Sequence, residues 1–85
     1  MMIEQILLYL MEHPDAKDAA EGIHKFWLVD SSPPATSEEV QNTLNFLVER
    51  GWLIVSESPA TPKLYRLNKL CLIKIQLFLK TLGNR

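Results

Sequence analysis

Three side chains in this sequence belong to types that bind metals or act as nucleophiles, namely His13, His24 and Cys71. Their spacing matches no zinc-ligand pattern, because such ligands come in closely spaced pairs. His13 precedes Pro14 at an expected turn, and Cys71 stands near the start of an apolar segment, where a thiol behaves as a small hydrophobic group. We therefore expect no metal site and interpret both histidines as surface or capping residues. A redox-sensing thiol is the alternative for Cys71.

Serine-based and acid–base catalysis also lack support in the sequence. Ser31, Ser32 and Ser37 lie in a proline-rich segment with no base nearby and no nucleophile-elbow pattern. The glycines at positions 22, 51 and 83 form no phosphate-binding loop, and no pair of carboxylates has the apolar surroundings of a general acid. The sequence therefore predicts a protein that is not an enzyme and has no catalytic residues or cofactors.

The charged residues are distributed unequally along the chain. Residues 1–39 carry two basic and eight acidic side chains, a net charge of −6, whereas residues 40–85 carry seven basic and two acidic ones, a net charge of +5. Such a division favours a two-signed surface with a basic face for an anionic partner. The alternative is that folding mixes these charges over the surface, so that no patch exists.

Length and composition predict one small globular domain. The chain has 85 residues, of which 47% are hydrophobic and 22% charged. A single cysteine cannot form an internal disulfide, which fits a reducing cytoplasm. The apolar start of the chain contains Glu4 and Gln5 and lacks a basic region, so it is typical of an amphipathic core helix and not of a signal peptide. No apolar run is long enough to span a bilayer, and we expect no membrane partner.

The spacing of apolar residues predicts a helix over 2–12, which ends at His13 because a residue before proline disfavours the helical region. A second helix is predicted over 15–28, with Asp15 as its N-cap. Gly22 within it predicts a close helix–helix crossing that would justify the cost of a glycine. The buried stripe of this second helix is expected to comprise Ala16, Ala19, Ile23, Phe26 and Trp27.

The segment TSEEVQNTLNFLVERGWLIV, residues 36–55, carries the clearest local signals. A loop over 30–37 with two prolines precedes a helix over 36–50, in which Thr36 and Glu39 match a capping box. Gly51 is expected to end this helix as a left-handed C-cap. The core face is expected to comprise Val40, Leu44, Leu47 and Val48. The opposite face is expected to comprise Glu38, Gln41, Asn42, Asn45 and Glu49.

Residues 52–67 are predicted to form a hairpin, with strands over 52–57 and 64–67 around a proline-rich turn. We expect Trp27 and Trp52 in the core, packed near each other. A last helix, with Asn68 as its cap, is predicted over 69–82, and apolar side chains nearly surround it. Such a helix either lies half-buried across the first helix or forms the interface of a homodimer. The expected interface residues are Leu72, Ile75, Leu79 and Leu82.

The run LVERGWLIV, residues 47–55, follows three helical segments and leads into a hairpin that closes with Tyr65, Arg66 and Leu67. This order, with Leu44 one turn earlier, resembles the winged helix-turn-helix domains of bacterial transcription regulators. The resemblance covers about residues 3–68. It implies a mostly α fold with a small β-hairpin wing (α+β), in which a three-helix core and a C-terminal helix form a single domain over 1–85.

The resemblance also implies a function, namely binding of duplex DNA by a cytoplasmic transcriptional regulator that acts as a homodimer. The helix over 36–50 would lie in the major groove, with Gln41, Asn42 and Asn45 facing the bases, since such amides can pair with adenine. The DNA backbone would be contacted by Thr43, Arg50, Lys63 and Arg66, and by the hydroxyl groups of Ser31, Ser32 and Ser37.

This helix departs from the family pattern, because its exposed face has no Arg or Lys and carries Glu38 and Glu49. Carboxylates oppose the phosphate neutralisation from which affinity for duplex DNA largely comes. A winged-helix protein-interaction or adaptor module without DNA binding is therefore the alternative function. An arrangement of Arg50, Lys63 and Arg66 beside the exposed amides would favour DNA. An acidic face beside a separate apolar patch would favour a protein partner.

Overall fold

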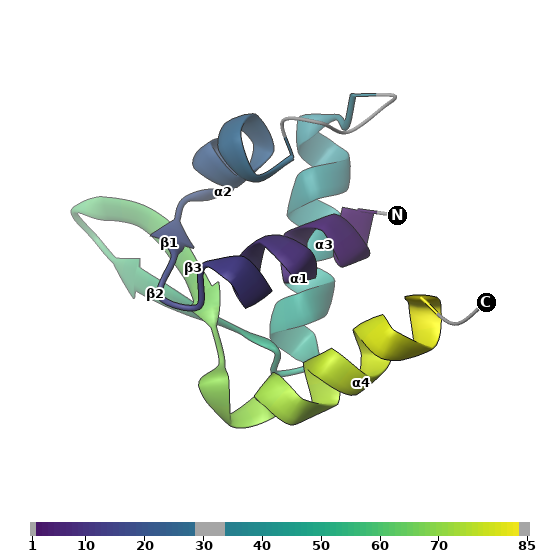
Figure 1. Ribbon diagram of the computed structural model, residues 1–85. Helices are drawn as coiled ribbons and strands as arrows, with labels where there is room; N and C mark the ends of the chain where they lie inside the picture. The colour runs from purple at the N-terminus through teal and green to yellow at the C-terminus, as the bar shows by residue number, and fades with distance from the viewer. Residues whose placement is uncertain (1, 29–33, 84–85) are drawn as a thin grey trace.

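The computed structural model describes residues 2–28 and 34–83. The predicted α+β class is confirmed, since the helices are joined by a three-stranded antiparallel sheet with the strand order β1-β3-β2, which lies to one side of them (Figure 1). None of the helices within these residues is long and apolar enough to cross a membrane. The elements, in chain order, are α1 (Met2–Glu12), β1 (Lys17–Asp18), α2 (Ala20–Gly22), the π-helical segment η1 (Ile23–Trp27), α3 (Ser37–Glu49), β2 (Leu53–Ser58), β3 (Thr61–Leu67), the 3-10 turn η2 (Lys69–Cys71) and α4 (Leu72–Gly83).

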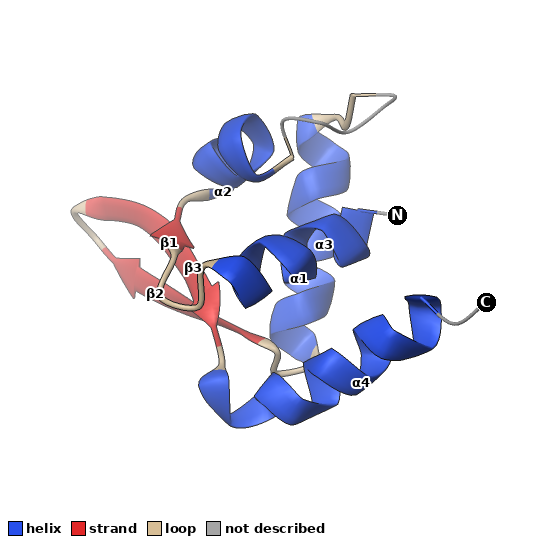
Figure 2. Ribbon diagram, in the orientation of Figure 1, coloured by secondary structure: helices blue, strands red, loops and turns tan. Residues whose placement is uncertain are grey.

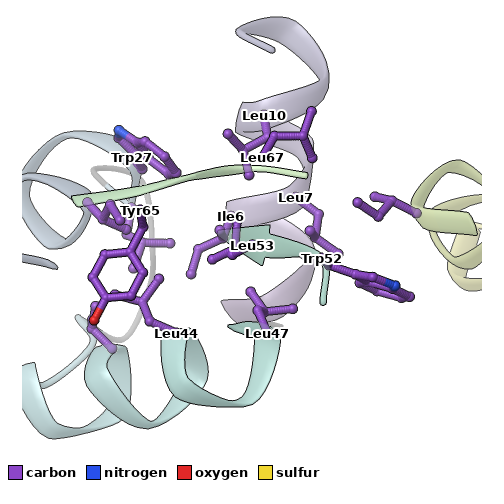
Figure 3. Close-up of a cluster of buried hydrophobic side chains, with 14 residues drawn as sticks. Ile6, Leu7, Leu10, Trp27, Leu44, Leu47, Trp52, Leu53, Tyr65 and Leu67 are labelled. Atoms are coloured by element: carbon purple, nitrogen blue, oxygen red, sulfur yellow. The ribbon is translucent and has the colours of Figure 1, made fainter. Parts of the chain in front are cut away.

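One hydrophobic cluster lies where α1, α3 and the β2–β3 hairpin meet (Figure 3). The helix α1 has the predicted bounds and buries Ile6, Leu7 and Leu10, which recur at helical spacing. The helix α3 contributes Leu44 and Leu47 from its predicted core face. Among the described residues, this cluster contains no buried polar or charged side chain. The fold is therefore held mainly by apolar burial.

Both predicted ends of α3 are confirmed. The Thr36 hydroxyl accepts a hydrogen bond from the backbone N–H of Glu39 (3.1 Å), and the Glu39 carboxylate accepts one from the backbone N–H of Thr36 (3.0 Å). The backbone hydrogen bond from Thr36 lowers the pKa of Glu39 from its ordinary value of 4.5. Gly51 follows α3 with a φ of 80°, a left-handed conformation that suits glycine.

The predicted second helix is wrong at its start. Residues 17 and 18 form strand β1 instead, in which Lys17 pairs with Arg66 and Asp18 pairs with Tyr65 of β3. The helical segment begins only at Ala20, so Asp15 does not cap it. A two-residue strand has no recognisable period in the sequence, and its partner lies almost fifty residues further along the chain.

The second half of this segment also differs from the prediction. Residues 23–27 form a π-helical turn, in which the N–H of Leu28 bonds to the carbonyl of Ile23 (3.2 Å). This wider turn places Ile23 and Trp27 toward the core and turns Phe26 outward, where 67% of its surface is exposed. The prediction that Phe26 is buried assumed an ordinary α-helical period and is wrong for this reason.

Gly22 has a different role from the predicted helix–helix crossing. A Cβ atom at this position would overlap the carboxylate of Asp18, which lies against the glycine. That carboxylate accepts a hydrogen bond from the backbone N–H of Ala19 (2.8 Å). The glycine therefore makes room for an aspartate that holds the chain between β1 and α2.

The hairpin is confirmed, and its second strand is longer than predicted (Figure 2). Its turn consists of Pro59 and Ala60, and β3 begins at Thr61. The pairing register shifts between Ser56 and Ser58, which accommodates Pro62 because an irregular pairing does not need its missing N–H. After the hairpin, the side chain of Asn68 accepts a hydrogen bond from Leu70 N (3.1 Å), as expected of a cap.

The close approach of Gly22 and Asp18 predicts a non-additive pair of substitutions. Gly22→Ala normally stabilises a helix by about 1 kcal/mol, but the added methyl group here displaces the Asp18 carboxylate, so we expect no gain. In an Asp18→Ala background, the same change should stabilise the chain by about 1 kcal/mol. Urea unfolding of the four proteins measures both values. Equal effects in the two backgrounds would contradict this role of the carboxylate.

The capping box predicts a dependence of stability on pH. The folded-state pKa of Glu39 is lowered, so its contribution is fully present above about pH 4.5 and is lost as the pH falls through the folded-state value. Glu39→Gln should therefore reduce the loss of stability below about pH 4.5, measured by urea unfolding across pH. Glu38→Gln is the matched control, since Glu38 stands in the same turn outside the capping box. If both variants change the acid limb equally, the capping interaction does not cause it.

Candidate functional site

The amide-bearing face of α3 is only partly available to a partner. Gln41 is half-buried, and its amide nitrogen donates hydrogen bonds to the Tyr65 hydroxyl and to the side-chain oxygen of Asn45, both at 3.0 Å. Gln41 therefore joins α3 to β3 and serves the fold. Asn42 and Asn45 are exposed on the same helix. Of the three residues expected to face DNA bases, these two lie on the surface.

Thr43 does not point toward the amide-bearing face. Its hydroxyl donates a hydrogen bond to the backbone carbonyl of Glu39 (2.8 Å) and contacts the sulfur of Met2 in α1 (3.2 Å). The hydroxyl of Thr43, which was expected to contact a phosphate, therefore points toward the body of the protein. Ser31 and Ser32, which were expected to contact phosphates, lie outside the described residues, and Ser37 is the first residue of α3.

Of the residues expected to contact the DNA backbone, Lys63 lies beside the exposed amide of Asn45. It lines a shallow pocket of about 280 Å³ between α3 and the hairpin, together with Asn45 and Glu49. Its amine also forms an ion pair with Glu57 on the neighbouring strand, at 3.4 Å. Because a carboxylate already partners this amine, little positive charge remains on this face.

Arg66 lies on the other face of the hairpin. Its neighbours Tyr65 and Leu67 are buried, and successive strand residues point to opposite faces. Arg66 is opposite Lys17 across the strand pair, and both line a pocket of about 140 Å³ with Lys69. Arg66 is therefore separated by the sheet from the exposed amides.

Arg50 occupies a third location, at the C-terminal end of α3. Its guanidinium lies over the ring of Trp52, 4.7 Å from the ring centroid, and 5.7 Å from that of Phe46. These stacking contacts direct the charge toward α4 and away from the amides. Arg50, Lys63 and Arg66, which were expected to contact one DNA backbone, thus lie in three separate places.

Acidic side chains dominate the exposed face formed by α3 and the hairpin. Its exposed carboxylates are Glu38, Glu39, Glu49 and Glu57. The basic side chain of Lys63 lines one pocket together with Glu49 and Glu57. Folding has therefore mixed the charges of the two halves of the chain in part, and the surface of α3 is acidic.

The C-terminal helix turns a different face outward from the one predicted. Ile75 has no exposed surface, and Leu72 and Leu79 pack against the core. The prediction that Ile75 lies at a dimer interface is therefore wrong, because the chain's own core covers it; Leu82 is half-buried. The exposed apolar residues are Leu70, Ile73 and Leu77, with 96%, 72% and 59% of their surface exposed. We call these three residues the apolar ridge.

A pocket of about 470 Å³ lies beside the apolar ridge, between α4 and the corner where α3 meets β2. We call it the α4 pocket. The rings of Trp52 and Phe78 form one wall and meet edge to face, with centroids 5.3 Å apart. The remaining lining residues are Arg50, Lys74, Leu77 and Thr81. An apolar wall with basic residues beside it suits a ligand that is both apolar and negatively charged.

The two tryptophans are buried, as predicted, but they have different partners. Trp27 stacks on Tyr9 with ring centroids 4.7 Å apart, whereas Trp52 meets Phe78. Figure 3 shows them at opposite sides of the hydrophobic cluster. The expectation that they pack near each other is therefore wrong.

The side chains considered for metal binding have separate surroundings. The ring of His13 lies 4.6 Å from that of Tyr9, the Nε2 atom of His24 lies 2.6 Å from the carbonyl oxygen of Ala35, and Cys71 contacts the Asn68 amide at 3.6 Å. Within residues 2–28 and 34–83, no group of three or more His, Cys, Asp or Glu side chains is placed to hold one metal ion.

Because Ile75 points inward and Ile73 points outward, the same substitution should affect stability very differently at the two positions. Ile75→Glu places a carboxylate in the core without a partner and should destabilise the chain by about 3 kcal/mol or more. Ile73→Glu leaves its charge in water and should change stability by less than about 0.5 kcal/mol. Thermal unfolding followed by circular dichroism measures both. Similar losses in the two variants would contradict the observed rotation of α4.

Comparisons with known proteins do not place this chain in a family. No family model, no curated protein and no solved structure matches it. Inferences about function therefore depend on the geometry of the surfaces of α3 and α4.

Proposed function

We propose that this chain is a winged-helix domain that acts as a protein-interaction module. The fold assignment is supported by the order of its elements, in which three helical segments lead through Gly51 into the β2–β3 hairpin and then into α4. The hairpin takes the place of the wing, and α3 takes the place of the recognition helix. Function does not follow from such a fold alone, so it is inferred from the surfaces.

The distribution of charge around α3 carries this proposal. A helix that binds in the major groove of DNA is usually flanked by Arg or Lys side chains, which neutralise the phosphates on both sides of the groove. Here Arg50 stacks on Trp52 near α4, Arg66 lies across the sheet, and Lys63 is paired with Glu57. The exposed face of α3 carries carboxylates instead, while the apolar ridge lies on another element. An acidic face and a separate apolar patch fit protein partners better than DNA.

Duplex DNA binding by a transcriptional regulator is the second candidate function. It is favoured by Asn42 and Asn45, whose exposed amides could bond to adenine, and by Lys63 in the pocket beside Asn45. Binding of this kind would depend on few phosphate contacts and would therefore be weak.

A fluorescence-anisotropy titration against random duplex DNA, at low and at physiological salt, separates the two functions. We expect no binding at micromolar protein even at low salt, because carboxylates on α3 repel phosphates. Micromolar binding that weakens steeply with added salt would instead support the second candidate.

The double variant Glu38→Gln, Glu49→Gln extends this test. It removes two carboxylates from the exposed face of α3 and keeps the shape of the side chains. If α3 enters the DNA groove, this variant should bind DNA more tightly than the natural chain. For an interaction module, neither protein should bind DNA at physiological salt.

A further inference from the structure

The apolar ridge and the α4 pocket form one continuous surface on the outer side of α4. Ile73 and Leu77 are four residues apart on one side of α4, and Leu70 lies three residues before Ile73 in the preceding turn η2. Leu77 also lines the pocket, so the ridge passes directly into it. Neighbouring large apolar side chains with this exposure are typical of an interaction surface.

The charged side chains that η2 and α4 themselves carry are all basic. The chain has no acidic residue after Glu57, so η2 and α4 carry only bases. Lys69 pairs with Asp15, but Lys74 and Lys80 form no ion pair with any described residue. The guanidinium of Arg50 is held over Trp52 at the edge of the pocket. The apolar ridge therefore lies among three cations that have no carboxylate partner in the described chain.

The charge and the shape of this surface together distinguish between its possible binding partners. A second copy that packed through its own α4 would bring Lys74 and Lys80 of the two chains together, and like charges would oppose this contact. An anionic bilayer would attract the lysines, but its flat surface would contact the ridge and not the wall of Trp52 and Phe78 in the open pocket beside it. An amphipathic helix can place one large apolar side chain in such a pocket and lay the next ones along the ridge.

We propose, on the basis of the interaction-module function, that the apolar ridge and the α4 pocket bind an acidic amphipathic helix of another protein. An apolar side chain of that helix enters the pocket against Trp52 and Phe78. Carboxylates on either side of its apolar face pair with Arg50, Lys74 and Lys80. The ridge supplies affinity through apolar burial, and the cations select a partner of opposite charge.

A designed peptide tests this proposal on the intact chain. The probe is a fluorescein-labelled helical peptide with leucines at three- and four-residue spacing and glutamates beside them, titrated by anisotropy. A scrambled peptide of the same composition is the control. We expect micromolar binding of the amphipathic peptide and at least about tenfold weaker binding of the scrambled one. Equal binding of the two peptides would overturn the proposal.

Two variants place the contact on α4. Ile73→Glu should weaken peptide binding by at least about tenfold, because it puts a carboxylate on the ridge facing those of the peptide. The matched control is Phe26→Ser, which removes an exposed apolar side chain on η1, and it should leave binding unchanged. A loss caused by Phe26→Ser and not by Ile73→Glu would overturn the assignment to α4.

A charge exchange tests the role of the cations. Lys74→Glu should weaken binding of the acidic peptide by about fivefold and should strengthen binding of a peptide whose glutamates are replaced by lysines. A uniform change for both peptides would show that charge does not select the partner.

The rival occupants give distinct results. A dimer in sedimentation velocity at micromolar concentration that Ile73→Glu dissociates would show that a second copy occupies the ridge, and this would overturn the proposal. Binding to phosphatidylserine vesicles, with no binding to the peptide, would assign the surface to a membrane and would also overturn it. Failure of the docking proposal is separable from failure of the proposed function, because DNA binding by α3 is measured independently of α4.

Discussion

One shared hydrophobic cluster constrains the helices and the β2–β3 hairpin of this protein, because a chain of 85 residues can form only one small core. The helix α1 packs against η1, α3 and α4, so each of these elements must turn one face toward it. Ile75 joins α4 to this cluster and thereby determines which side of the helix remains outside. The packing of each element against this core therefore determines which of its side chains are exposed.

The same constraint assigns several polar residues to the fold. Gln41 bonds to the hydroxyl of the buried Tyr65, since a buried hydroxyl without a partner would be costly. Asp18 holds the chain between β1 and α2, and Gly22 leaves space for it. Residues that would suit recognition by their chemical type therefore serve as structural contacts, and fewer groups remain for a partner.

The acidic surface of α3 is consequently separated in space from the basic and apolar surface of α4. The acidic residues of α3 face one side, and the exposed leucines and lysines of α4 face another. Such a separation gives the domain two surfaces of different chemistry, and each suits a partner of opposite charge. Because Arg50 at the end of α3 stacks on Trp52, its positive charge lies beside the surface of α4.

The elements that depend on local signals are predictable from the amino-acid sequence. The bounds of α1, the capping box of Thr36 and Glu39, the left-handed Gly51 and the cap at Asn68 were all predictable, because each depends on residues within one or two turns. Strand β1, the outward position of Phe26 and the inward face of α4 depend on tertiary contacts. Pairing with Arg66 and contact with the core come from residues distant in sequence, and a helix that is apolar on nearly every side does not indicate which face will be buried. The separation of Arg50, Lys63 and Arg66 has the same cause, since their placement depends on how α3, the hairpin and α4 pack together.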